Sequence, residues 1–465
     1  MQQTKITSSG LPTRWFAPAY GMGSLGPAIF ILTPQILLLF FMTEILAIPP
    51  GAAGIGILIP KVWELIFDPL LGRWSDRLNT RWGRRRPLMA LGALVFLIAF
   101  IMMFSPPDLS SWQSTLLWVV IFYTLTSTGY SLFTVPYATL LAEVTDDPHV
   151  RTRIAAWRSA ILALGFLLAG ALAPWVVAAQ GGDHQAYTYM AVLIALIAFG
   201  GMASAVVGTG TAQAAAKASP PSLNKRGSML APFKNRAFSW LWLGFMIQMI
   251  SVALNTAMLP FYSKYWLGND AATIPTIFLG LTVLTIATTW CWIWLAGRFG
   301  KHNGFLIATL LYGAATASLW FAMYGAVGLW FSIVLFGISN AGQQLFCFAI
   351  VPDIIAQQRQ QTGIAEEGAF TGLWIWGEKI GLAFGAGLAG LILQLAGFQQ
   401  GSGTALQEQT PFALLAVACS VSFLPGLICL LSIPAIWLSK KRMADLSQKM
   451  QTQDFDETPQ LFSKE

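Results

Sequence analysis

The sequence has few charged residues. Only 10% of its 465 residues are Asp, Glu, Lys or Arg, whereas soluble globular proteins carry roughly 25%. This shortage excludes an ordinary soluble enzyme. Intrinsic disorder is excluded as well, because 55% of the residues are hydrophobic and 13% are aromatic, which is far from the polar composition that keeps a chain unfolded.

Histidine and cysteine are scarce too. The three histidines, His149, His184 and His302, fall in connections between apolar runs, so the inward histidines that haem, di-iron and zinc sites in membranes need are missing. The four cysteines lie inside apolar runs and predict neither a disulfide framework nor a metal cluster. The absence of a GxxxxGK loop argues against a primary pump. We therefore expect no enzyme activity and no cofactor.

What the sequence does have is long apolar runs. A helix needs about 20 apolar residues to cross a bilayer, and twelve segments meet this requirement: 20–46, 52–75, 87–105, 113–143, 154–178, 186–208, 237–266, 272–296, 304–325, 327–352, 368–397 and 411–437. They predict an all-α membrane protein with twelve transmembrane helices. Residues 209–236, rich in Ala, Ser, Pro and Lys, predict a cytoplasmic linker. We expect a six-helix bundle at 1–208, a second at 237–437, and a cytoplasmic tail at 438–465 that is polar and mobile from Met443 onward.

Basic residues predict the orientation in the membrane. Arg and Lys follow every even-numbered span, whereas on the other side only the connection after the seventh span has a basic residue, Lys264. Because Lys and Arg mark cytoplasmic loops, both termini are predicted to be cytoplasmic, in an inner or plasma membrane. The loop clusters also account for the net charge of +7 and leave no basic face for nucleic acid.

The two halves of the sequence share a motif. Gly72-Arg73-Trp74-Ser75-Asp76-Arg77 closes the second span, and Gly297-Arg298-Phe299-Gly300-Lys301 closes the eighth, its equivalent in the second half. Matching turns of this kind are typical of a duplicated transporter.

The first of these turns belongs to a longer run. Residues 63–87, with Asp68-Pro69 before the turn and Arg81-Trp82-Gly83-Arg84 after it, resemble the glycoside–pentoside–hexuronide:cation symporter family of the major facilitator superfamily, which includes melibiose carriers and sodium-dependent lysolipid carriers. Val135-Pro136-Tyr137 and residues 145–153 continue the resemblance. It implies a major facilitator fold of two pseudo-symmetric six-helix bundles, and a secondary active transporter that works by alternating access.

Two acidic residues lie inside the second span. Glu64 falls near the middle of the span and Asp68 lies one turn further on the same face. Two neighbouring carboxylates are unfavourable unless a cation, a proton or a basic side chain neutralises them, which is the requirement for a coupling-ion site. Lys61 is on that face as well. A static Lys61–Glu64 salt bridge, with Asp68 serving only a cytoplasmic latch, is therefore the alternative to a Na⁺ or H⁺ site.

The resemblance adds roles to these charges. It implies that Glu64 and Asp68 hold the coupling Na⁺ or H⁺. It also implies that Lys379, in span eleven, lies near that site, and that Arg158, in span five, faces the central cavity. A lysine from the second half would then link the two halves electrostatically, and cation entry would release it.

The substrate cavity departs from the galactoside carriers of this family. The positions where those carriers have two acids and an aromatic correspond to Ala28, Thr134 and Ala138. The candidates for the cavity wall are polar or aromatic residues inside spans: Tyr20, Thr134, Tyr137, Asn340, Gln344 and Trp374, with Gln35, Gln248, Asn255 and Gln343 as further possibilities. The amides among them have an alternative role, which is to bond to neighbouring helices.

A conformational latch is predicted at the cytoplasmic ends of the helices. There Gly72 allows a close helix approach, and acids lie among arginines that can form ion pairs made and broken during the transport cycle. The predicted latch comprises Gly72, Asp76, Arg77, Arg84, Asp146 and Arg151. For Arg84 to Arg86 the alternative is that they only fix the topology.

The leading functional hypothesis is a monomeric symporter, in a lipid bilayer, of a small solute, most commonly a sugar or glycoside in this family. An amphiphile such as a lysolipid, or an organic anion that uses Arg158 and Lys379, stays open. A non-transporting scaffold for pigment–protein assembly is the alternative from another class, and the carboxylates at Glu64 and Asp68 favour coupled transport over it.

Overall fold

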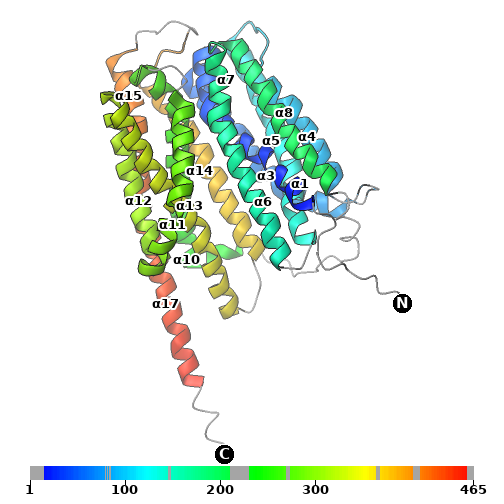
Figure 1. Ribbon diagram of the computed structural model, residues 1–465, viewed down its shortest axis with the longest axis vertical. Coiled ribbons are helices and arrows are strands. Elements are labelled where there is room, and N and C mark those ends of the chain that lie inside the picture. The colour runs from blue at the N-terminus through cyan, green and yellow to red at the C-terminus, as the bar shows by residue number, and fades with distance from the viewer. Residues whose placement is uncertain are drawn as a thin grey trace, which may run out of the picture. The chain divides into compact units, whose positions relative to one another are not determined.

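The computed structural model describes residues 15–78, 80, 82, 85–144, 148–209, 230–268, 273–362, 367–401 and 409–457. Within these residues all regular structure is helical (Figure 1). A helix satisfies its backbone N–H and C=O groups within one segment, which the hydrocarbon layer of a membrane demands because it offers no water as a partner. The predicted all-α fold class is confirmed.

Helices of the first half of the chain follow one another through short connections. They are α1 (Phe16–Met22), α2 (Leu25–Phe40), η1 (Phe41–Ile45), α3 (Pro50–Arg77), α4 (Arg86–Met103), α5 (Trp112–Val144), α6 (Pro148–Leu167), η2 (Leu168–Leu172), α7 (Ala173–Ala179) and α8 (His184–Gly208). The segments η1 and η2 are π-helical turns that continue α2 and α6 without a break.

The second half repeats this pattern. Its helices are η3 (Ala231–Lys234), α10 (Arg236–Phe261), η4 (Tyr262–Trp266), α11 (Thr273–Phe299), α12 (Lys301–Ser318), η5 (Leu319–Tyr324), α13 (Ala326–Thr362), α14 (Glu367–Leu395), α15 (Pro411–Ser422), α16 (Leu424–Leu430) and α17 (Ile433–Glu457). The π-helical turn η4 ends the seventh span, as η1 ends the first.

Eleven helical segments of the described chain are long and apolar enough to cross a membrane. The second predicted span is not among them, because α3 contains Lys61, Glu64 and Asp68 near its middle. At 28 residues, α3 is nevertheless about 42 Å long, enough to span a bilayer. With α3 as the twelfth, the structure accounts for each predicted span.

The described chain divides into two compact units. The first comprises Met1–Leu223, Thr256–Leu279 and Ala386–Ala418, and the second comprises Asn224–Asn255, Gly280–Gly385 and Cys419–Glu465. Three long helices of the second half are divided between the units, with one part of each in the first unit and the rest in the second: α10, α11 and α14. The bundle boundaries expected from the sequence stay a prediction.

Close helix packing in the first unit centres on α5, which contacts α3 and α4. Glycines make this possible: a Cβ atom at Gly92 would lie 2.6 Å from the backbone nitrogen of Phe133, and one at Gly129 would lie 2.6 Å from that of Phe96. At Gly72, by contrast, Val135 at 4.0 Å is the only described neighbour that a Cβ atom would reach. Among the described residues, the close helix approach occurs between α4 and α5 rather than at Gly72.

Helix α17 continues into the predicted tail. A cytoplasmic tail was predicted at 438–465, polar and mobile from Met443 onward, and α17 runs to Glu457 within it (Figure 1). Its residues 438–457 include neither glycine nor proline and contain several Lys, Gln, Met and Leu residues, which are good helix formers. Propensity therefore extends the helix beyond the apolar run.

Candidate functional site

An ion pair lies in the middle of α3. The Lys61 Nζ atom donates to Glu64 Oε1 at 2.9 Å, and the Glu64 side chain is only 1% exposed. The two residues are three apart, so the helix itself brings their side chains together. The structure thus shows the pair that the sequence left as an alternative to a cation site.

Aromatic rings surround the ammonium group of this pair. The Lys61 Nζ atom lies 4.2 Å from the centroid of the Phe30 ring and 5.7 Å from that of Tyr123. Tyr130 stacks on Phe30, with 4.3 Å between the ring centroids. A cation over an aromatic face is attracted by the ring quadrupole, most strongly where water is excluded. The sequence did not predict this cage, because its rings come from α2 and α5.

Asp68 lies one turn further along α3 and is half-buried. The neighbouring helix α5 runs beside α3 in a register fixed by two contacts: Ser127 Oγ donates to the Pro60 carbonyl at 3.4 Å, and Trp63 Nε1 donates to Thr128 Oγ1 at 3.0 Å. If this register continues along α5, Ser131 lies at the same height as Glu64 along the pair of helices.

Two hydroxyl groups of α5 stand out in this register. Among the described residues, neither Ser131 Oγ nor Thr134 Oγ1 has a hydrogen-bond partner, although both atoms are buried. A buried hydroxyl usually has one. Thr134 was predicted to line the cavity, whereas Ser131 was missed, because one serine in an apolar helix is no signal until the register is known.

The other two predicted charge partners are on α6 and α14. Arg158, on α6, is half-buried, with its Cζ atom 5.8 Å from the centroid of the Tyr137 ring. Lys379, on α14, is half-buried and belongs to the second unit, whereas Glu64 belongs to the first. The predicted electrostatic link between Lys379 and the acids of α3 stays a prediction.

Two predicted cavity residues contact each other. Tyr20 and Tyr137 stack with 4.4 Å between ring centroids, and each hydroxyl donates to the other residue's carbonyl, at 2.9 and 2.7 Å. Ser24 Oγ lies 3.0 Å from the Tyr137 hydroxyl. Both rings are at most 1% exposed, so in this state they join α1 to α5.

The three predicted cavity residues of the second unit differ in their exposure and in their hydrogen bonds. The Asn340 amide donates to Thr285 Oγ1 at 3.2 Å, whereas Gln344 is exposed. Trp374 stacks on Phe245 at 4.0 Å, and its Nε1 has no hydrogen-bond partner in the described part of the chain. Trp374 therefore has an unused donor in an otherwise apolar cluster.

Three of the remaining amides bond to neighbouring segments, which is their alternative role, and the fourth, Gln35 on α2, is half-buried. Gln248 donates to Thr309 Oγ1 at 3.0 Å and to Ser432 Oγ at 3.1 Å. Asn255 donates to the Val421 carbonyl at 2.9 Å, and Gln343 to Cys429 Sγ at 3.3 Å.

Most of the predicted latch falls outside what the structure describes. Arg84 and Asp146 are not among the described residues, and the side chains of Asp76, Arg77 and Arg151 are not described either. The adjacent Arg85, for which a topological role was the alternative, is 6% exposed and donates from Nη1 to Ser75 Oγ at 2.8 Å. It joins the end of α3 to the start of α4.

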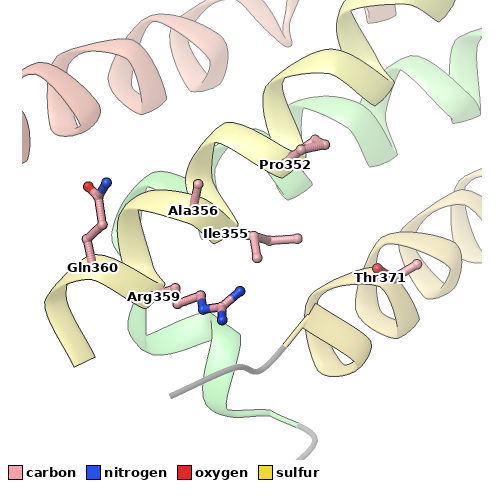
Figure 2. Close-up of a pocket in the computed structure, with 6 residues that line it drawn as sticks. All are labelled: Pro352, Ile355, Ala356, Arg359, Gln360 and Thr371. Carbon is pink, nitrogen blue, oxygen red and sulfur yellow. The ribbon is translucent and has the colours of Figure 1, made fainter. Parts of the chain in front are cut away.

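One cavity of about 690 Å³ lies at the end of α13. Figure 2 shows its lining, with the Arg359 side chain directed into the space between α13 and α14. The lining residues are Pro352, Ile355, Ala356, Arg359, Gln360 and Thr371. None of the predicted cavity residues is among them.

The described residues include no group of three or more His, Cys, Asp or Glu side chains that could hold a metal ion. A pair of carboxylates with hydroxyl neighbours suits a proton or a weakly held monovalent cation instead. Long apolar helices with such a buried pair in one span are the features of an integral membrane transporter.

Comparison with known proteins agrees. A sequence profile of the family described as MFS/sugar transport protein matches residues 19–440. The chain therefore belongs to this family, in the glycoside:cation symporter branch of the major facilitator superfamily, and it is a transporter rather than an enzyme.

Relatives match nearly the whole chain. An uncharacterized symporter of Synechocystis is 26% identical, covering 93% of this chain and 96% of the relative. A glucuronide carrier protein homolog of Escherichia coli is 25% identical, covering 90% of each. Among solved structures, a bacterial homolog of the human lysosomal transporter Spinster has a TM-score of 0.63 at 14% identity, over 93% of this chain and 95% of that one. This last likeness shows the fold alone.

Proposed function

We propose that this protein is a symporter that couples the movement of a sugar or glycoside to that of Na⁺ or H⁺ by alternating access. The observation that carries the proposal is the Glu64 carboxylate, which is 1% exposed inside a membrane-spanning helix. An ionisable group at this depth costs roughly 2.5–3.5 kcal/mol or more to insert, so such groups usually serve ion pathways.

Lys61 supports an exchangeable site. Its ammonium neutralises Glu64 in this state, and a coupling cation does the same with its own charge. We propose that Na⁺ or H⁺ enters between Glu64 and Asp68 and releases Lys61, which keeps the cation–π contact with Phe30. The Ser131 hydroxyl is the proposed neutral oxygen ligand, because it is buried and uses no hydrogen bond in the described structure.

The substrate class rests on the relatives. One of them is a glucuronide carrier protein homolog, and the matching family is that of MFS/sugar transport proteins. Arg158 gives the first unit a half-buried cation beside the Tyr137 ring, which can pair with a sugar acid. We therefore propose that neutral glycosides and hexuronides are the first substrates to test.

Uptake into proteoliposomes tests the coupling. Purified protein is reconstituted with an inward Na⁺ gradient or an inward H⁺ gradient, and the uptake of radiolabelled glycosides and glucuronides is measured. We expect gradient-driven uptake that Glu64→Gln and Asp68→Asn abolish. Asp445→Asn is the matched control, since its carboxylate is 46% exposed and uptake should persist. Full uptake by both α3 variants would contradict the assignment of the cation site.

Further parts of the proposal concern topology and assembly. We propose that the chain acts as a monomer with both termini in the cytoplasm, and that the acids and arginines following α3 and α5 form the conformational latch. Labelling of single cysteines from either side of the membrane tests the orientation.

A further inference from the structure

Lys264 is the exception to the charge pattern of the sequence, and the structure gives it a partner. Its Nζ atom lies 2.5 Å from Glu44 Oε2, and the Tyr265 hydroxyl donates to the same oxygen at 2.7 Å. The Glu44 side chain is 0% exposed and that of Lys264 is 27% exposed. All three residues belong to the first unit.

The partners come from equivalent places in the two halves. Glu44 lies in η1, the π-helical turn that ends the first span, and Lys264 and Tyr265 lie in η4, the π-helical turn that ends the seventh. A π turn adds a residue to the helix and rotates the side chains that follow it; such turns are frequent at functional sites. Here the two turns direct opposite charges toward each other.

Apolar rings form a layer beneath the ion pair. Phe261, which precedes η4, packs edge-on against Phe40 at 5.0 Å and against Phe398 at 5.4 Å between centroids. The Phe261 ring is 0% exposed. The layer therefore joins the ends of the first and seventh spans to the connection that follows the eleventh.

The backbone around Gly401 packs closely against η1 next to this ion pair. The Gly401 N–H donates to the Thr43 carbonyl at 3.1 Å, and a Cβ atom at Gly401 would lie 2.7 Å from the Glu44 carbonyl oxygen. Only glycine fits there without displacing η1. The three connections that meet here follow odd-numbered spans, so they lie on the side opposite to the arginine clusters.

The carboxylate is not fully satisfied. Glu44 Oε1 is buried and has no hydrogen-bond partner among the described residues. A carboxylate that is shielded from water is stabilised mainly by its cationic partner. Removing that partner leaves an uncompensated buried charge, which is strongly unfavourable. In an open state the same carboxylate would be hydrated. The pair therefore favours the closed state only while both partners are present.

We propose that Glu44, Lys264 and Tyr265 form an extracytoplasmic gate that holds this side of the protein shut and opens during each transport cycle. The proposal deepens the alternating-access part of the proposed function and rests on it. It gives Lys264 a role other than setting topology: it neutralises the gate carboxylate.

A cysteine reporter tests the gate without any substrate. In a full-length chain whose four native cysteines are replaced by alanine, Ser263→Cys places a thiol in η4, where the serine is 1% exposed. A membrane-impermeant maleimide is added from the extracytoplasmic side, and the labelling rate is measured. We expect slow labelling with the gate intact.

The gate variants have a predicted order. Lys264→Gln should raise the labelling rate most, by roughly tenfold or more, because it strands the buried Glu44. Glu44→Gln should raise it less, since Lys264 is partly exposed and reaches water. Tyr265→Phe should raise it least. The double variant Glu44→Gln, Lys264→Gln should label more slowly than Lys264→Gln alone, because no buried charge is left.

Lys301→Gln is the matched control. It removes another lysine from an ion pair, but Lys301 and Asp353 are both 42% exposed, so the labelling rate should not change. Equal rates in all variants, or a double variant as fast as Lys264→Gln, would overturn the gate. Hydrogen exchange gives an independent test in a Lys264→Gln variant that keeps the four native cysteines. Faster amide exchange across 41–45 and 262–266 than in the parent protein supports the gate.

The two proposals fail separately. If labelling follows the predicted order but no gradient drives uptake, the coupling proposal is wrong and the gate stands. If uptake is coupled but the labelling rates are equal, the gate is wrong and the cation site is unaffected.

Discussion

The two units bury different kinds of polar residue. In the described chain, the buried charged residues are Glu44, Glu64 and Arg85, and all belong to the first unit. The buried polar residues of the second unit are neutral, with Gln248 and Asn255 as examples. Neutral amides can fix helices to one another at little cost, whereas charges need a partner that can be exchanged. The difference supports the proposal that the coupling ion binds within the first unit.

Removing one partner of the α3 pair should have the largest effect. Glu64→Ala removes the carboxylate that pairs with the Lys61 ammonium in its aromatic cage, and we expect a loss of about 3–5 kcal/mol in the free energy of unfolding. Chemical unfolding in detergent, followed by tryptophan fluorescence, measures it. Asp445→Ala removes an exposed carboxylate and should stay within about 0.5 kcal/mol of the parent.

Removing both partners sharpens the comparison. Lys61→Met combined with Glu64→Gln leaves no buried charge, so stability should return to within about 1.5 kcal/mol of the parent. Gradient-driven uptake should stay lost. Recovery of coupled uptake in this double variant would show that the pair is only structural.

The neutral network of the second unit should be less sensitive. Gln248→Leu removes the hydrogen bonds to Thr309 and Ser432, and interhelical bonds of this kind average about 0.6 kcal/mol, with a maximum near 1.7. The same unfolding measurement applies. A loss as large as that of Glu64→Ala would remove the distinction between the units.

A similarly small effect is expected at Trp374. Its Nε1 makes no hydrogen bond within the described chain, whereas its ring stacks on Phe245. Trp374→Phe keeps an aromatic ring and should cost less than about 1.5 kcal/mol. If unfolding changes little but substrate affinity falls in a binding assay, the unused N–H is a substrate donor, as the sequence predicted for this position.

Much of the fold could be predicted from apolar runs. The predicted span 113–143 corresponds to α5, Trp112–Val144, and 186–208 corresponds to α8, His184–Gly208. Apolar content alone does not reveal where a helix continues past the membrane, so α17 extends beyond the predicted tail boundary. The π turns were not predicted either, because an inserted residue changes the side-chain direction without changing composition.

The sequence predicted only those contacts of the candidate site that form between residues of one helix. The spacing of Lys61 and Glu64 shows that they share a face, and the structure shows their pair. The aromatic cage of Phe30 and Tyr123, the hydroxyl of Ser131 and the pairing of Glu44 with Lys264 each depend on the register between different helices. One sequence does not contain that register. The roles of these residues in coupling stay predictions.

The Lys61–Glu64 contact has a consequence for biosynthesis. Because both residues lie within one turn of α3, their charges can neutralise each other as soon as that helix forms, before any later segment leaves the ribosome. A translocon would then receive α3 as a nearly neutral segment. We expect that separating the pair along the chain would lower the fraction of α3 integrated into the membrane, even if the finished protein could restore the contact.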